Sequence, residues 1–233
     1  MIVAAALCPG PPLLVRELSG TDPSAAILRE ACCAAVAELV ATDPDLVAVV
    51  GTADRTSEWP ETARPDLASY GPALPRPAVV APLSVGLGAL LLGQVAYRGP
   101  TRLQTLDAAA PETLCKKIAE ELDAAAARVG LLVVADGSAR RSLKAPGYFD
   151  PRAEHYDAAV QQAIATGDLG ALRTLDPELA RELMASGWAA LQLLAAAFEG
   201  DRPQTTIHYA DAPFGVGYLV ATIARSSARA GDG

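Results

Sequence analysis

The chain has 233 residues, of which 51% are hydrophobic and 20% are charged, and its formal net charge is −8. A chain of this length and apolar content can bury a large core, and it fits one α/β domain better than two small domains. The acidic balance excludes nonspecific binding to nucleic acid or to an anionic membrane surface as a main activity, because clustered Lys and Arg are needed to bind phosphate groups.

Cysteine usage and the lengths of the apolar runs predict a cytoplasmic protein. The four cysteines include no CxxC pair, which is typical of reduced thiols rather than of a disulfide framework. The start, MIVAAALCPG, has the apolar character of an export signal, but it lacks a positively charged leader and fits a buried first strand better. No apolar stretch reaches the roughly 18 residues that a membrane helix needs, so no membrane partner is expected.

The first part of the chain has the pattern of a strand, a helix and a second strand. Residues 2–7 are apolar and end in a Pro/Gly loop. Asp22 and Pro23 supply an N-cap and a first-turn proline, and apolar residues then recur at helical spacing up to Asp43. The buried run 46–50 completes a βαβ unit, whose two strands are expected to run parallel.

The middle of the chain is less regular. Residues 52–77 are polar and contain many prolines, which predicts a long functional or flexible loop. Residues 78–81 are expected to form a short strand, and 84–97 a helix, although glycines among the leucines leave the periodicity ambiguous. The GLG segment 86–88 lacks the third glycine and the acidic partner of a dinucleotide-binding fingerprint.

Residues 131–134 are apolar on both alternating faces, which is typical of a buried strand in a parallel sheet. A clear apolar stripe before them predicts a helix over 112–129 that stops at Gly130. Further helices are predicted over 151–166, 169–174 and 178–198, and two strands over 205–209 and 216–224. These elements predict a single-domain α/β fold, with a central, mostly parallel sheet flanked by helices, over residues 1–225 and a flexible tail over 226–233.

The loop that follows 131–134 is the first candidate site, because open α/β sheets bind their ligands at the carboxyl ends of their strands. Arg140, Arg141 and Lys144 could hold a carboxylate or a phosphate, or they could pair with the many acidic residues of a solvated surface. Asp136 precedes them at the start of the loop. Ser138 is a candidate nucleophile, but it lacks the GxSxG context of a nucleophile elbow.

Candidates elsewhere are sparse. Cys8 could act as a nucleophile, although a small cysteine at a strand end is more often buried. His155 fits the surface of a helix. His208 and Asp211 lie in and after a predicted strand, whose alternation separates their side chains. Two histidines without an HExxH or HxH arrangement predict no histidine-rich metal site.

Four segments share motifs with one family: CPGPPLLV, DGSARRSL, the long stretch that starts APGYFDPRAEHYDAAV, and YADAPFGVGYLVA. Together they resemble the class III extradiol ring-cleaving dioxygenase superfamily, of the type of the protocatechuate 4,5-dioxygenase catalytic subunit. The resemblance covers nearly the whole chain and is strongest from Leu131 onward. It implies an extradiol dioxygenase-like fold and, by resemblance alone, a chain that pairs with itself or with a small partner protein.

In that superfamily a PHPP motif and a later histidine bind iron, a GDxSH motif carries a catalytic histidine, and an acid near the terminal PFG completes the iron site. Here Gly10 stands in PGPP, the second position falls near Ala53 or Asp54, and Ala139 stands in ADGSA. Of the four positions in this pattern, only the acidic one is retained, as Asp211. A ferrous site of this kind needs two imidazoles and a carboxylate, so no iron, and no other metal, is expected.

The leading hypothesis is therefore a divergent member of this superfamily without iron-dependent ring cleavage. It would bind a small anionic molecule or a protein partner in the former active-site cleft. The candidate ligand-binding residues are Asp54, Asp136, Arg140, Arg141, Lys144 and Asp211. The alternative is an active enzyme, a dioxygenase or another catalyst, with a rebuilt site in which Ser138 and Cys8 are the candidate catalytic residues.

Overall fold

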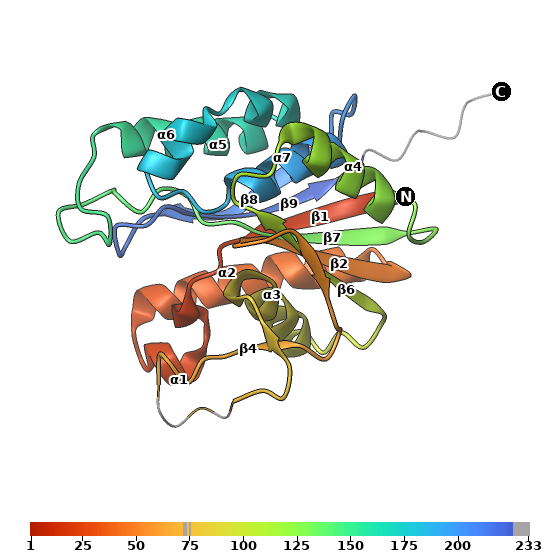
Figure 1. Cartoon of the computed structure of the whole chain (residues 1–233), viewed down its shortest axis with the longest axis horizontal. Coiled ribbons are helices and arrows are strands. Elements are labelled where there is room, and N and C mark those ends of the chain that lie inside the picture. The colour runs from red at the N-terminus through yellow and green to blue at the C-terminus, as the bar shows by residue number, and fades with distance from the viewer. Residues whose placement is uncertain (72–73, 75, 226–233) are drawn as a thin grey trace.

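The computed structural model describes residues 1–71, 74 and 76–225, and it contains a seven-stranded sheet between two layers of helices (Figure 1). The strand order is β3-β6-β2-β7-β1-β9-β8. The bounds are β1 Ile2–Cys8, β2 Leu46–Ala53, β3 Ser57–Trp59, β6 Thr101–Asp107, β7 Val129–Val134, β8 Gln204–Asp211 and β9 Tyr218–Ala224. The predicted α/β fold, one domain with a central and mostly parallel sheet, is confirmed.

The four central strands run parallel, and the antiparallel pairs lie toward the edges. Strand β7 pairs with both β1 and β2, and β2 pairs with β6, all in parallel. Strands β3, β9 and β8 add antiparallel pairs. All residues of β7 are buried, as expected for a strand that is apolar on both faces. The carboxyl ends of β1, β2 and β7 therefore meet at one edge.

Each face of the sheet has its own hydrophobic core. One layer contains η1 Pro12–Leu14, α1 Arg16–Ser19, α2 Pro23–Ala41 and α3 Leu83–Gln94, with the short strands β4 Arg64–Pro65 and β5 Val80–Ala81 beside it. The other contains α4 Glu112–Asp123, α5 Arg152–Ala165, η2 Leu169–Thr174, α6 Pro177–Glu182 and α7 Trp188–Ala197. Leu131 and Val133 of β7 face the second layer, and Leu132 and Val134 face the first. No helix in these described ranges has the length and apolarity needed to cross a membrane.

Three predicted elements are wrong. The predicted loop over 52–77 contains β3 and β4. The helix predicted over 112–129 ends at Asp123, because Val129 joins the sheet and pairs with Ile2 of β1. The helix predicted over 178–198 is two helices, α6 and α7, separated by a turn in which Met184 has a positive φ of 55°. The predicted tail 226–233 lies outside the described residues.

The glycines of the GLG segment allow α3 to approach the sheet closely. A Cβ atom on Gly86 would lie 2.7 Å from Cβ of Pro65, and one on Gly88 would overlap Cγ1 of Val49. This segment therefore packs a helix against strands, which is consistent with the missing features of a dinucleotide-binding motif. The close packing also fixes the start of α3 beside the end of β2.

Candidate functional site

Three adjoining cavities lie along the edge where β1, β2 and β7 end. The outer hollow, of about 510 Å³, is lined by residues 52–55, Trp59 and 80–84. The inner cavity, of about 170 Å³, is lined by Gly10, Thr52, Leu83, Ser84, Val134, Asp136 and Ser186. The Asp157 cavity, of about 150 Å³, is lined by Asp136, Arg141, Asp157, Asp211 and ten further residues. Because neighbouring cavities share wall residues, we treat the three as one candidate site.

Asp136 lies between the inner cavity and the Asp157 cavity. It follows the end of β7, and its Oδ1 accepts a hydrogen bond of 2.9 Å from the backbone N–H of Gly10. Burial raises the pKa of this carboxyl to about 6, although the Gly10 N–H acts in the opposite direction. The carboxyl thus changes its protonation near neutral pH at a cavity wall, which is a common property of functional carboxyl groups.

Asp157 of α5 holds the loop that follows β7. Its Oδ1 accepts a 2.8 Å hydrogen bond from the backbone N–H of Ser138, and its Oδ2 accepts a 2.7 Å bond from the Ser138 hydroxyl. The guanidinium of Arg141 donates to Oδ2 at 3.1 Å and lies 3.7 Å from Glu154. A Cβ atom on Gly137 would lie 2.7 Å from Oδ1, so a glycine there lets the loop approach the carboxylate. This network fixes the loop, and within it Arg141 already forms an ion pair with Asp157.

The outer hollow has polar groups without protein partners. The Ser84 hydroxyl donates to the carbonyl oxygen of Thr52 at 2.9 Å, whereas Oγ1 of Thr52 is buried and has no partner within the described chain. The guanidinium of Arg55 lies 4.9 Å from the centre of the Trp59 ring. Helix α3 begins at Leu83 without a side-chain cap, so its first N–H groups and positive dipole end lie at the same wall.

Half of the residues predicted from the sequence line these cavities. Asp54 lines the outer hollow, Asp136 lies at the junction, and Arg141 and Asp211 line the Asp157 cavity. Lys144 is exposed and Arg140 is half-buried, and neither lines the three cavities.

The two candidate catalytic residues are buried outside the cavity walls. Ser138 is 0% exposed, and its hydroxyl binds Asp157. Cys8 is 0% exposed, and its Sγ lies 4.0 Å from the carbonyl oxygen of Cys32 on α2. Hydrogen bonding to the Cys8 thiol and burial raise the pKa of Cys32 well above its ordinary value. A nucleophilic role for Cys8 or Ser138 therefore remains a prediction that would require movement to reach a ligand.

The described side chains do not fit an iron centre. No three His, Cys, Asp or Glu side chains in the described part of the chain come together as a metal site. His155 is exposed on α5, and His208 lies on β8 with Nε2 3.1 Å from the Thr222 hydroxyl. A Cβ atom on Gly10 would lie 2.8 Å from Cγ1 of Val134, so a histidine there would also need space that Val134 occupies.

Sequence reasoning missed Ser84 and Asp157, and it indicated Thr52 only as part of the polar segment 52–56 at a strand end. The signal for Asp157 was its position in the apolar stripe of α5, four residues after buried Ala153 and three before buried Val160. A carboxylate on a buried helix face requires a partner, which here is the Ser138 loop. Ser84 had no such signal, because its proximity to Thr52 depends on how α3 packs against the sheet.

Comparison with known proteins supports the fold. No protein-family model matches the chain. No curated protein matches it either. The fold is similar to that in the crystal structure of uncharacterized protein JW3007 from Escherichia coli K12, with a TM-score of 0.53 and 14% sequence identity over 95% of this chain and 99% of that one. At this identity the likeness shows the fold alone.

Proposed function

We propose that this chain is a divergent member of the class III extradiol dioxygenase superfamily that binds a small anionic molecule and does not cleave aromatic rings with iron. The motif resemblance supports the family, and it assigns Gly10, Ala53 and Asp54 to positions that line the inner cavity and the outer hollow. The observation that carries the binding proposal is the wall shared by these two cavities, where the buried Thr52 hydroxyl has no partner in the described chain.

The charges favour the outer hollow for the anionic end of the ligand. The Asp157 cavity combines Asp136, Asp157 and Asp211 with a single cation, Arg141, which is already paired. The outer hollow instead has one acid, Asp54, beside one cation, Arg55, and the first turn of α3 adds a second group that attracts an anion. Its volume of about 510 Å³ accommodates a small molecule.

Asp136 defines the other end of the proposed ligand. Above pH 6 its carboxylate accepts hydrogen bonds, so a hydroxyl group that enters the inner cavity would donate to it. The proposed ligand therefore has an anionic group and a hydrogen-bond donor, separated by an apolar body that contacts Trp59, Leu83 and Val80. We propose no resident metal or cofactor, because the described side chains do not fit iron.

A second candidate function is catalysis at Asp136. A carboxyl with a pKa of about 6 at the junction of two cavities could transfer a proton to or from a bound molecule. This is the active-enzyme alternative with a rebuilt site, and it needs neither Cys8 nor Ser138. For either function we propose a cytoplasmic protein without nucleic-acid or membrane partners, consistent with the net charge of −8, and, by resemblance alone, a homodimer.

Replacing Arg55 with glutamine is expected to weaken binding of 4-hydroxybenzoate about tenfold, because the charge-assisted contact to the carboxylate is lost. This probe has one carboxylate for Arg55 and one hydroxyl for Asp136. Isothermal titration calorimetry of the EDTA-treated protein measures the effect. Arg16→Gln is the matched control, because Arg16 is an exposed arginine that does not line the three cavities.

Thr52→Val separates ligand binding from folding in the same titration. Removing a buried hydroxyl that has no partner in the described chain leaves the free energy of unfolding equal or higher. The affinity for the probe should nevertheless fall, because the ligand loses a hydrogen bond. Equal affinities of the wild type, Arg55→Gln and Thr52→Val proteins would contradict binding at this wall.

A further inference from the structure

Five of the ten exposed large hydrophobic side chains in the described chain gather at one end of the molecule. They come from the loop between β7 and α5, from the β8–β9 turn and from the turn after α6, which lie at the left of Figure 1. We call them the apolar patch: Leu143 (66% exposed), Tyr148 (63%), Phe149 (48%), Met184 (47%) and Phe214 (37%). Contiguous exposed apolar groups of this kind mark interaction surfaces.

Backbone contacts bring the three segments together. The N–H of Arg141 donates to the carbonyl oxygen of Gly215 at 3.0 Å, and the N–H of Ala139 donates to that of Leu183 at 2.9 Å. A Cβ atom on Gly147 would lie 2.7 Å from Sδ of Met184. The three segments that carry the patch residues therefore adjoin, although they are distant in the sequence.

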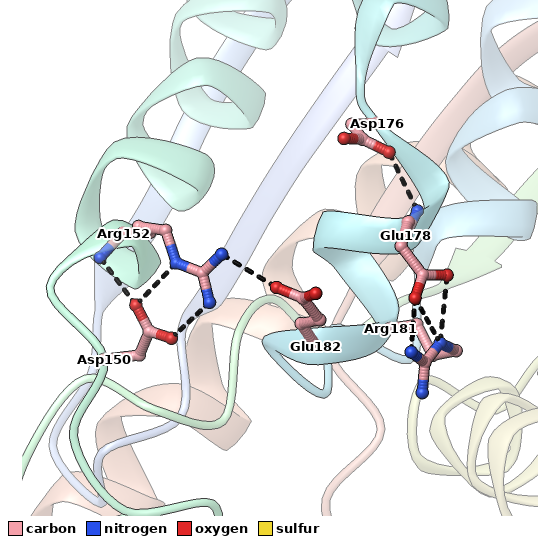
Figure 2. Close-up of polar contacts among 6 residues, drawn as sticks. All are labelled: Asp150, Arg152, Asp176, Glu178, Arg181 and Glu182. Carbon is pink, nitrogen blue, oxygen red and sulfur yellow. Dashed lines mark hydrogen bonds and ion pairs between the residues drawn. The ribbon is translucent and has the colours of Figure 1, made fainter.

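Ion pairs link the end of the loop between β7 and α5 to helix α6 (Figure 2). The Asp150 carboxylate, at the end of the loop, accepts hydrogen bonds from Nε and Nη2 of Arg152 at 3.0 and 2.7 Å. Nη1 of Arg152 donates to Glu182 of α6 at 2.7 Å. These bonds with Arg152 lower the pKa of Asp150 to about 2. A fixed surface loses less conformational entropy when a partner binds.

The backbone at two patch residues is strained. Tyr148 has a φ of 61° and Met184 a φ of 55°, in the left-handed region that favours glycine. A large side chain in this region is disfavoured, and such strain is often kept for function. Glycine would suit both backbones better, yet both positions have large, exposed apolar side chains.

The loop that contributes three of the five patch residues is locally basic. The loop 139–150 contains three basic residues, Arg140, Arg141 and Lys144, and one acidic residue, Asp150, whereas the chain has a net charge of −8. Lys144 is exposed, and among the described residues it forms no ion pair. Arg141 is already paired with Asp157 and Glu154, so Lys144 is the exposed cation of this loop that can attract an acidic group of a partner.

We propose that the apolar patch docks a segment of another protein that presents apolar side chains flanked by acidic residues. A mainly apolar groove of about 460 Å³ continues from Met184 along α6 to Trp188 and gives such a segment a place for a buried anchor. This surface meets the inner cavity at Ser186 but includes neither Thr52 nor any residue of the outer hollow, so the proposal goes beyond the proposed function.

The test selects random 12-residue displayed peptides on the wild-type protein and measures the affinity of the selected peptides. The expected peptides combine apolar residues with Asp or Glu. Their affinity should fall at least tenfold for Tyr148→Gly, which removes the side chain and also relieves the backbone strain, so that the variant folds at least as stably as the wild type. Lys144→Glu should also lower the affinity of the selected peptides, and the effect should be largest at low salt.

Ile27→Ser is the matched control, because Ile27 is 57% exposed on α2, on the opposite layer of the sheet. It should leave the peptide affinities unchanged. Two results of the selection would overturn the proposal: peptides that bind Tyr148→Gly as tightly as the wild type, or a consensus of basic residues. The proposal would also be overturned by a dimer in sedimentation velocity that Tyr148→Gly dissociates. Binding to phosphatidylserine vesicles that depends on Tyr148 would overturn it as well.

Discussion

Replacing Asp157 with alanine is expected to lower the free energy of unfolding by about 3 kcal/mol, because it removes hydrogen bonds to Ser138 and leaves the Arg141 guanidinium without its nearest anion. The Asp157 side chain is only 13% exposed, so water cannot replace these contacts fully. Urea denaturation followed by circular dichroism measures the change. Arg141 should also move, which would alter the Asp157 cavity.

Asp211→Ala provides the comparison, because Asp211 is an exposed carboxylate at the same cavity and should change stability by no more than about 0.5 kcal/mol. The free energy of unfolding of Asp157→Asn should lie between those of Asp157→Ala and Asp211→Ala, since the amide keeps one acceptor oxygen but loses the charge. If Asp157→Ala were as stable as the wild type, the network would not hold the loop.

Asp136 is expected to make the folded protein less stable as the pH rises from about 4 to about 7. Its carboxyl has a pKa of about 6 in the folded protein against an ordinary value of 3.8, so between these pH values the folded state binds more protons than the unfolded state. The free energy of unfolding therefore decreases with rising pH across this window, by about 2 kcal/mol in total. Below about pH 4 the carboxyl is protonated in both states, and its stabilising contribution is complete.

Asp136→Asn should remove this dependence and should be about 2 kcal/mol more stable than the wild type at pH 8. Its amide oxygen can still accept the Gly10 hydrogen bond. The comparison uses urea denaturation of both proteins at pH 4 and pH 8. Asp150, whose pKa is lowered to about 2, has the opposite effect below pH 4, and the difference between the two proteins cancels it. Parallel pH profiles would contradict a raised pKa at Asp136.

The sequence predicts β1, β2, β7, β8 and β9, but it misses β3 and β6 at one side of the sheet. Strand β7 and helix α2 follow from an apolar run and from the Asp22 cap, whose carboxylate accepts the N–H of Ala25 at 2.9 Å. Strand β6 was missed because it includes Gln104 and Thr105, which look polar in the sequence but are buried. Their side chains bond to backbone carbonyl groups near β3, a partner that only the fold provides.

The sequence indicated the position of the candidate site better than it indicated which side chains line it. The loop after β7 does reach a cavity edge, because β7 is central and its carboxyl end borders β1 and β2. Residues distant in the sequence decide which side chains of this loop can contact a ligand. Asp157, for example, accepts a hydrogen bond from Ser138 and forms an ion pair with Arg141. Arg55 and Thr52 lie in the segment 52–56, which the sequence indicated as polar residues at a strand end but without assigning a role to either residue.

The affinity of the protein for 4-hydroxybenzoate, titrated once in EDTA and once with one equivalent of ferrous iron under anaerobic conditions, tests the central claim most directly. The account predicts the same affinity in both titrations, because Arg55, Thr52 and Asp136 form the proposed site and no set of described side chains fits the metal. Binding that occurs only with ferrous iron, at one ion per chain, would contradict a metal-free binding site.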